Sequence, residues 1–392
     1  MKIAAALIAG ILVLFFWFVG DGYKYLPVVQ KMGTDSYRGA TSTRALPTPS
    51  TLTATTTEKA PRVVTHIKTP EHVKAIYMSS WVAGTPSLRA KLVKLVDTTE
   101  LNAIVIDVKD NTGLLSWNGR IADLDDFLDE LHSKNIYVIA RIAAFQDPLY
   151  VKNHPDQAVR SKSTGGIWKD RKGVPWVDTG SKDMWKYIEN VSKDSYARGF
   201  DEINLDYIRF PTDGKLSDMT FPISGERAKT DKAGIVSDFY YYITDALRKD
   251  GIPVSGDIFG IVMVTKVDIP TLGQDMHVAL ETFDFVSPMI YPSHFYAGTA
   301  GYQNPAQHPG EIITFAMKKG IEIADQVASS TGQATSTIRA KYRPFYQDFD
   351  MGAIYTAELV RAQIDAGNKL GIDSWMLWDP SNKYTPSALK AQ

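Results

Sequence analysis

Short apolar runs alternate with longer amphipathic segments from residue 75 to the C-terminus. The short runs are rich in β-branched and aromatic residues, as strands are, and the longer ones have the apolar spacing of helices. The expected strands are 75–81, 103–108, 136–141, 202–207, 254–259, 285–291, 344–349 and 374–379. The expected helices are 87–98, 123–134, 181–198, 233–249, 275–282, 309–328 and 357–370. This alternation predicts right-handed βαβ units and a parallel sheet.

Eight strands are the number that a closed parallel barrel requires, so the predicted fold is α/β, a (β/α)8 TIM barrel. The competing architecture is a doubly wound open sheet. It is disfavoured because no GxGxxG or GxxxxGK[ST] motif follows any expected strand. The length from His72 to Gln392 also suits a barrel with insertions.

An uncharged apolar run, AAALIAGILVLFFWFVG, occupies residues 4–20. Its 17 residues are at the short limit for a membrane-spanning helix. The bulky FFWF end lacks the small residues that signal peptidase requires, so we expect a retained single-pass anchor within residues 1–24. Lys2 agrees with an N-in orientation, which would make the rest of the chain extracytoplasmic. Cleavage and secretion remain the alternative.

The segment after this run has the composition of a linker. Residues 41–61 are dominated by Thr, Ser, Ala and Pro, with too few large apolar residues to form a core. We therefore expect a disordered Ser/Thr/Pro-rich stalk at 25–71 and the barrel domain at 72–392.

The composition of the chain excludes several kinds of binding and catalytic site. The net charge is -1, with 43 basic and 44 acidic residues, which provides no general attraction to nucleic acid. The absence of cysteine excludes disulfides, thiolate zinc sites and cysteine nucleophiles. The seven histidines show no HxH, HxxxH or HExxH spacing, so we expect neither a metal nor a cofactor. The 8 Trp, 19 Tyr and 16 Phe suit a sugar-binding surface or simply a large aromatic core. We expect a monomer.

Active sites of such barrels lie at the C-terminal ends of the strands. These ends carry Trp81, Asp107, Lys109, Arg141, Asp206, Arg209, Asp257, Tyr291, Asp348, Trp378 and Asp379. An Asp after a strand is also a common helix cap or turn residue, so each member has a structural alternative.

The best catalytic pair is Asp206 and Asp257, at equivalent ends of adjacent strands. We expect Asp206 to be the nucleophile or base and Asp257 the acid, with the reverse assignment open, and Arg209 to keep Asp206 ionised. The other strand-end candidates are expected to bind substrate: Trp81, Asp107, Lys109, Arg141, Tyr291, Trp378 and Asp379. Glu202, at the start of its strand, is expected to be structural.

Five segments carry a resemblance to a known family. They read IVIDVKDNTG, GFDEINLDYIRFP, VSGDIFG, FVSPMIYPSHF and WMLWDPSNKY. In this order they resemble the bacterial family described as a "putative glycosyl hydrolase domain", over residues 74–386. The resemblance implies a (β/α)8 fold and a carbohydrate substrate.

A more distant similarity is to family 18 chitinases, whose fourth strand ends in DxxDxDxE. Here Asp201, Asn204 and Asp206 occupy that stretch, and Ile208 stands where the catalytic acid would be. The chitinase mechanism therefore does not carry over to this chain.

The insertion at residues 145–180 contains Trp168 and Trp176. A long loop on the working face can bind substrate, or its tryptophans can pack against the barrel rim, and the sequence favours neither.

The leading functional hypothesis is a glycoside hydrolase that cleaves O-glycosyl bonds in an extracellular or cell-envelope polysaccharide. A non-catalytic glycan-binding barrel is the alternative, because no strand ends in Glu. A third possibility, an envelope scaffold, predicts no cleft.

Overall fold

The computed structural model describes residues 62–392, and a compact unit runs from Val64 to Gln392. The expected anchor at 4–20 and the stalk up to residue 61 lie outside the described residues. Within residues 62–392, no helix is both long and apolar enough to cross a membrane. The compact unit begins before His72, the residue at which the sequence predicts the domain to start.

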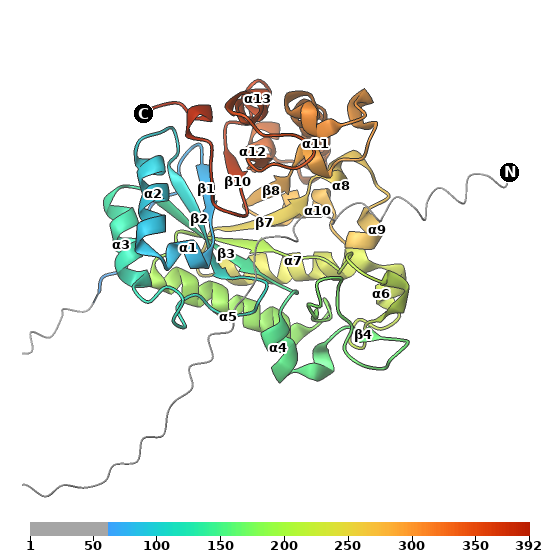
Figure 1. The fold of residues 1–392 in the computed structure, drawn as a ribbon. Coiled ribbons are helices and arrows are strands. Elements are labelled where there is room, and N and C mark those ends of the chain that lie inside the picture. The colour runs from blue at the N-terminus through green and yellow to red at the C-terminus, as the bar shows by residue number, and fades with distance from the viewer. Residues whose placement is uncertain (1–61) are drawn as a thin grey trace, which may run out of the picture. The chain divides into compact units, whose positions relative to one another are not determined.

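Eight parallel strands form a closed barrel, which confirms the predicted fold (Figure 1). They are β1 (Lys74–Met78), β2 (Ala103–Lys109), β3 (Tyr137–Ala143), β5 (Glu202–Asp206), β7 (Val254–Phe259), β8 (Phe285–Met289), β9 (Phe345–Gln347) and β10 (Trp375–Trp378). Neighbours in sequence are neighbours in the barrel, and β1 closes it by pairing with both β2 and β10. Each strand falls within or overlaps one of the expected segments.

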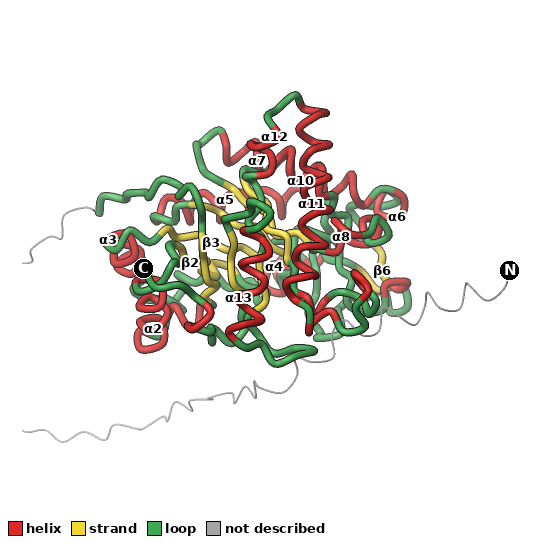
Figure 2. The backbone as a smooth tube through the Cα atoms, turned by 90° about the horizontal axis from the view of Figure 1, so that it is seen from above, coloured by secondary structure: helices red, strands yellow, loops and turns green. Residues whose placement is uncertain are grey.

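Helices surround the strands, as Figure 2 shows from above. The longer ones are α2 (Pro86–Asp97), α3 (Leu124–Ser133), α5 (Lys182–Arg198), α7 (Lys232–Arg248), α10 (Met276–Thr282), α11 (Pro309–Thr331) and α13 (Ala357–Asn368). Shorter ones are α1 (Ser80–Ala83), α4 (Pro148–Asn153), α6 (Arg227–Thr230), α8 (Ile261–Val264), α9 (Ile269–Leu272) and α12 (Thr335–Arg339). Local sequence sets the ends of α5: the Ser181 hydroxyl accepts the N–H of Met184, and Gly199 ends the helix at φ 111°.

A small antiparallel sheet outside the barrel ties together the loops that follow β3 and β5. It pairs β4 (Arg160–Ser161) with β6 (Met219–Thr220). Two-residue strands are too short to show a sequence period, so the sequence does not predict them. Trp168 and Trp176 of the same insertion are buried. The Trp176 indole N–H donates to Asp170 at 3.1 Å. The structure therefore supports the packing interpretation of these tryptophans.

The N-terminal end of the barrel is held by buried ionic groups. Arg343 donates to Glu202 at 2.6 Å, and the Tyr137 hydroxyl donates to the same carboxylate oxygen at 3.0 Å. The carboxylate of Asp201 accepts the backbone N–H of Ile67 at 2.7 Å, which fastens the segment before β1 to the barrel. The structural role expected for Glu202 agrees with this position at the start of β5.

Candidate functional site

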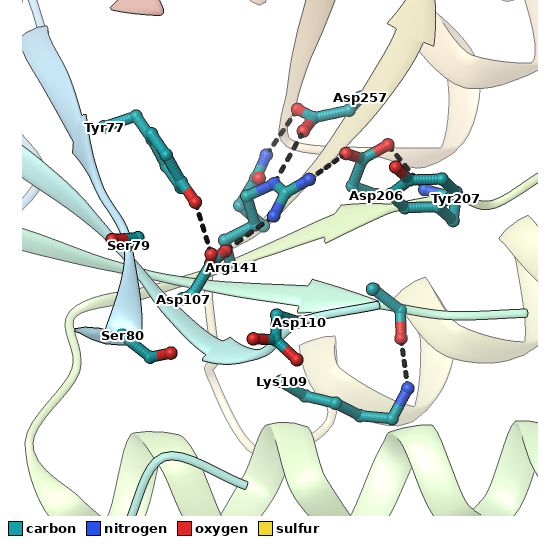
Figure 3. Close-up of polar contacts among 12 residues, drawn as sticks. Tyr77, Ser79, Ser80, Asp107, Lys109, Asp110, Arg141, Asp206, Tyr207 and Asp257 are labelled. Atoms are coloured by element: carbon teal, nitrogen blue, oxygen red, sulfur yellow. Dashed lines mark hydrogen bonds and ion pairs between the residues drawn. The ribbon is translucent and has the colours of Figure 1, made fainter. Parts of the chain in front are cut away.

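A polar cluster centred on Arg141 occupies the C-terminal end of the barrel (Figure 3). One guanidinium nitrogen of Arg141 donates to Asp107 Oδ1 at 2.6 Å, and another donates to Asp206 Oδ2. The third, Nε, lies 3.9 Å from Asp257 Oδ2. A single cation from β3 therefore connects carboxylates from β2, β5 and β7.

The register of the parallel strands places these residues at one level. Arg141 pairs with Asp107 on one side and with Asn204 on the other. Leu205 pairs with Gly256, so Asp206 and Asp257 come next in register on adjacent strands. Because side chains alternate between the two faces of a strand, Asn204 and Asp206 share one face, on which the interior contacts of this cluster are made.

The three carboxyl groups differ in burial, and burial shifts the pKa of two of them, Asp257 and Asp107. Burial raises the pKa of Asp257 well above its usual range, and the neighbouring Asp206 raises it further, against the opposing effect of Arg141. Burial also raises the pKa of Asp107, again opposed by Arg141. Burial alone would lower the pKa of Arg141, but its carboxylate neighbours hold it well above the usual value. The cluster therefore places the guanidinium of Arg141 beside Asp257, a carboxyl group whose pKa is raised.

Asp206 is the most accessible of the three. Its side chain is 11% exposed, against 4% for Asp107 and 1% for Asp257. Asp206 Oδ1 accepts the backbone N–H of Tyr207 at 2.5 Å. Tyr207 has a φ of 55°, in the left-handed region that non-glycine residues adopt at a cost, and this conformation is part of the turn that follows β5. Asp206 therefore accepts two hydrogen bonds and remains at the surface of the cluster.

Tyr77 and Trp378 complete one side of the cluster. The Tyr77 hydroxyl donates to Asp107 Oδ2 at 2.5 Å, and its ring stacks on Trp378 with centroids 3.9 Å apart. The Arg141 guanidinium carbon lies 5.0 Å from the centroid of the Trp378 ring. Both oxygens of Asp107 are thus engaged, which makes this carboxylate a support for Arg141. Sequence reasoning missed Tyr77, although the alternation of β1 could have placed it on the inward face.

The structure brings together most of the predicted site residues. Asp107, Arg141, Asp206, Asp257 and Trp378 form the cluster. Tyr291 is buried near the cluster. Burial raises the pKa of its hydroxyl, and the charges of Asp257 and Asp206 raise this pKa further. Trp81, on α1, lies after the end of β1 and is 61% exposed.

Lys109 does not face the cluster, which corrects the prediction that it binds substrate there. The register between β2 and β3 shifts between Asp107 and Lys109. The ammonium group instead lies 2.8 Å from Asp147 and donates to the carbonyl of Ala143 at 2.5 Å. Because it is fully buried in these contacts, Lys109 fastens the β3 loop rather than reaching a ligand.

Arg209 is not the cation bound to Asp206, because that cation is Arg141. The Arg209 guanidinium donates to the carbonyl of Phe210 at 3.0 Å and to the Thr212 hydroxyl at 3.1 Å, and it lies 5.0 Å from the Trp176 ring centroid. The chain turns at Tyr207, so Arg209 lies in the loop beyond the strand.

Asp379 caps a turn. Its Oδ1 accepts the backbone N–H groups of Ser381 at 2.5 Å and Lys383 at 3.2 Å. These contacts explain an Asp at this position without a substrate. Among residues 62–392, no group of three or more His, Asp or Glu side chains is arranged to hold a metal ion.

Comparisons with known proteins identify a matching family and solved structures that share this fold. A family model described as "Putative glycosyl hydrolase domain" matches residues 75–384. The glycoside hydrolase domain of PgaB (BpsB) from Bordetella bronchiseptica aligns with a TM-score of 0.54 at 12% identity, covering 79% of this chain and 94% of that chain. The α-galactosidase TtGalA from Thermus thermophilus aligns with a TM-score of 0.50 at 12% identity, covering 84% of this chain and 61% of that chain.

A hypothetical protein from Ruminiclostridium thermocellum is 33% identical over a match that covers 48% of this chain and 99% of that chain, with a TM-score of 0.41. No curated protein matches this chain. At 12% identity, the two hydrolase structures show a shared fold and nothing finer.

Proposed function

This chain belongs to the family described as "putative glycosyl hydrolase domain", and on that premise we propose that it hydrolyses glycosidic bonds in an extracellular or cell-envelope polysaccharide. The observation that carries the proposal is the pair formed by Asp206 and Asp257 at the same level of two adjacent strands, with Arg141 contacting both. Glycosidases need one carboxylate that is ionised and one carboxyl group that holds a proton.

The contacts of the cluster support Asp206 as the nucleophile or base. Its carboxylate accepts hydrogen bonds from Arg141 and from the Tyr207 N–H, which hold it in a fixed position. It is also the most accessible carboxylate of the three. Arg141 also donates to Asp107, so its single positive charge is shared between two carboxylates while it holds Asp206 in position.

The raised pKa of Asp257 supports its role as the acid, since burial and the neighbouring Asp206 favour its protonated form. Its side chain is almost fully buried, so the proposal requires Asp257 to become accessible when the sugar binds. A carboxyl separation of about 5–5.5 Å in the complex would correspond to retention of configuration, and about 6.5–9.5 Å to inversion.

Aromatic residues at the same end of the barrel supply the sugar-binding part of the proposal. Trp81 is widely exposed, and Trp378 is half-buried against Tyr77. Flat indole faces suit the apolar faces of sugar rings. We also propose that residues 4–20 anchor the chain in a membrane, with the barrel outside the cytoplasm and monomeric.

A non-catalytic glycan-binding barrel is the second candidate, and a specific observation favours it. Asp107 and Asp206 are both bonded to Arg141, and Asp257 is buried, so the cluster is also consistent with a fully structural polar network.

The experiment is a glycan panel assayed with the full chain and with Asp206→Asn and Asp257→Asn. Both variants should lose turnover while retaining glycan binding, because an amide keeps the shape of the carboxyl group but cannot attack or donate a carboxylic proton. Asp245→Asn, on the exposed face of α7, is the matched control and should keep wild-type turnover.

Wild-type turnover in either site variant would exclude that carboxyl group from the pair. Binding that depends on Trp81 or Trp378, without turnover of any glycan, would favour the binding barrel.

A further inference from the structure

Asn204 is a buried amide beneath the candidate pair. It lies in β5, where it pairs with Arg141 of β3 on one side and Ser255 of β7 on the other. Its side-chain nitrogen donates to Asp257 Oδ1 at 2.8 Å and to Ser255 Oγ at 3.1 Å. The side chain is fully buried, and its nitrogen is already engaged by Asp257 and Ser255. Any effect of Asn204 on the chemistry must therefore act through Asp257.

The orientation of this amide is fixed by Ser255. A serine hydroxyl has one hydrogen to donate, and that of Ser255 is directed at the carbonyl of Ile203, 3.4 Å away. Ser255 Oγ is thus an acceptor toward Asn204. A flipped amide would place the Asn204 oxygen against Ser255 and would require Ser255 to abandon Ile203. The nitrogen therefore faces both Ser255 and Asp257.

A neutral carboxyl group has one hydrogen, on one of its two oxygens. Because Asp257 Oδ1 accepts the amide hydrogen of Asn204, the hydrogen of the acid belongs on Oδ2. Oδ2 is the oxygen 3.9 Å from Arg141 Nε, on the side where Arg141 joins Asp257 to Asp206. We propose that Asn204 is a positioning residue that keeps the proton of Asp257 on Oδ2. This inference rests on the proposed role of Asp257 as the acid.

The effect of removing Asn204 has a predictable sign. A hydrogen bond donated to a carboxylate stabilises its ionised form and lowers its pKa, as the Asn204 bond does for Asp257. Without the amide, the pKa of Asp257 should rise by about one unit further, the usual value of one such bond. The Oδ1 carbonyl would also lose its hydrogen bond.

Infrared spectroscopy measures both effects without a substrate. The experiment compares pH-difference spectra of three full-length proteins: wild type, Asn204→Leu and Asp257→Asn. The protonated-carboxyl band that is present in wild type and absent in Asp257→Asn is assigned to Asp257. In Asn204→Leu this band should move to higher wavenumber, and its titration midpoint should rise by about one pH unit.

Asn204→Ser, whose side chain is too short to reach Asp257, gives the same readout if the leucine variant does not fold. Gln274→Met is the matched control, because the Gln274 amide donates at 3.1 Å to the backbone carbonyl of Asp257 and not to its carboxyl group. Its band and midpoint should stay at the wild-type values.

The outcomes separate the inference from the proposed function. If Asp257→Asn removes the band but the Asn204 variants leave it unmoved, the positioning role of Asn204 is wrong. The assignment of Asp257 as the acid then still stands. If the wild type shows no band that depends on Asp257, the assignment of Asp257 as the acid is wrong, and the inference about Asn204 fails with it. A shifted band in a protein that turns over no glycan supports the positioning of the proton while the enzymatic proposal fails.

Discussion

Asp348 offers a test of the electrostatics that needs no substrate. It follows β9 and is buried, and its two oxygens accept the backbone N–H of Thr385 at 2.9 Å and the Thr385 hydroxyl at 2.7 Å. Burial raises the pKa of Asp348 from 3.8 to about 7, and nearby Asp379 adds to the rise, against the opposing effect of the Thr385 bonds. The folded protein therefore holds this proton more tightly than the unfolded chain does.

The sign of the pH dependence follows from that difference. The stabilisation by the Asp348 proton is fully present below the unfolded pKa near 4 and is lost as pH rises through 7. A rise of about three pKa units, at about 1.36 kcal/mol per unit, corresponds to about 4 kcal/mol as an upper limit. Between pH 5 and pH 8, about 2.5 kcal/mol of this should disappear.

The perturbation is Asp348→Asn. The amide oxygen can accept the Thr385 N–H and the amide nitrogen can donate to the Thr385 hydroxyl, so both hydrogen bonds survive without a titrating group. Relative to wild type, the variant should gain about 2.5 kcal/mol in free energy of unfolding between pH 5 and pH 8.

Urea unfolding of the wild type and the variant at several pH values between 5 and 8 measures this difference. Asp245→Asn, whose side chain is 65% exposed, is the control and should follow the wild type at every pH. A constant offset between Asp348→Asn and wild type across this range would refute the reasoning, because it would show that Asp348 titrates alike in the folded and unfolded states.

Three further predictions follow from other parts of the chain. Arg343→Met should lower the free energy of unfolding by about 3–5 kcal/mol in urea unfolding, since it leaves Glu202 buried without its cation; a loss below about 1 kcal/mol would contradict this. Trp81→Ala should leave the melting temperature within about 1 °C, because the ring is exposed, yet weaken glycan binding in calorimetry, and unchanged affinity would remove Trp81 from the sugar site. Membrane fractionation should recover the full chain with the membranes through residues 4–20, and a soluble mature chain beginning near residues 20–25 would exclude the retained anchor.

Local pattern was enough for the eight barrel strands and the longer helices, because each of them shows its spacing of apolar residues within a single segment. Position along β5, and not the period of two, separates Glu202 at the start of the strand from Asp206 at its end, since both residues lie on the same face. Parallel strands bring their C-terminal ends to one face, so the sequence alone groups Asp107, Arg141, Asp206 and Asp257. Gly199 and Ser181 likewise mark the ends of α5 in sequence.

Tertiary structure alone decided which partners meet. Arg209 is three residues from Asp206 along the chain, yet Arg141 from β3 binds Asp206, because strand register brings residues distant in sequence to one level while the turn at Tyr207 places Arg209 in the loop beyond the strand. The shift of register before Lys109 carries its ammonium group to Asp147. Strand periodicity records which face a side chain takes, but hydrogen-bond partners depend on distances across the barrel, which no local pattern encodes.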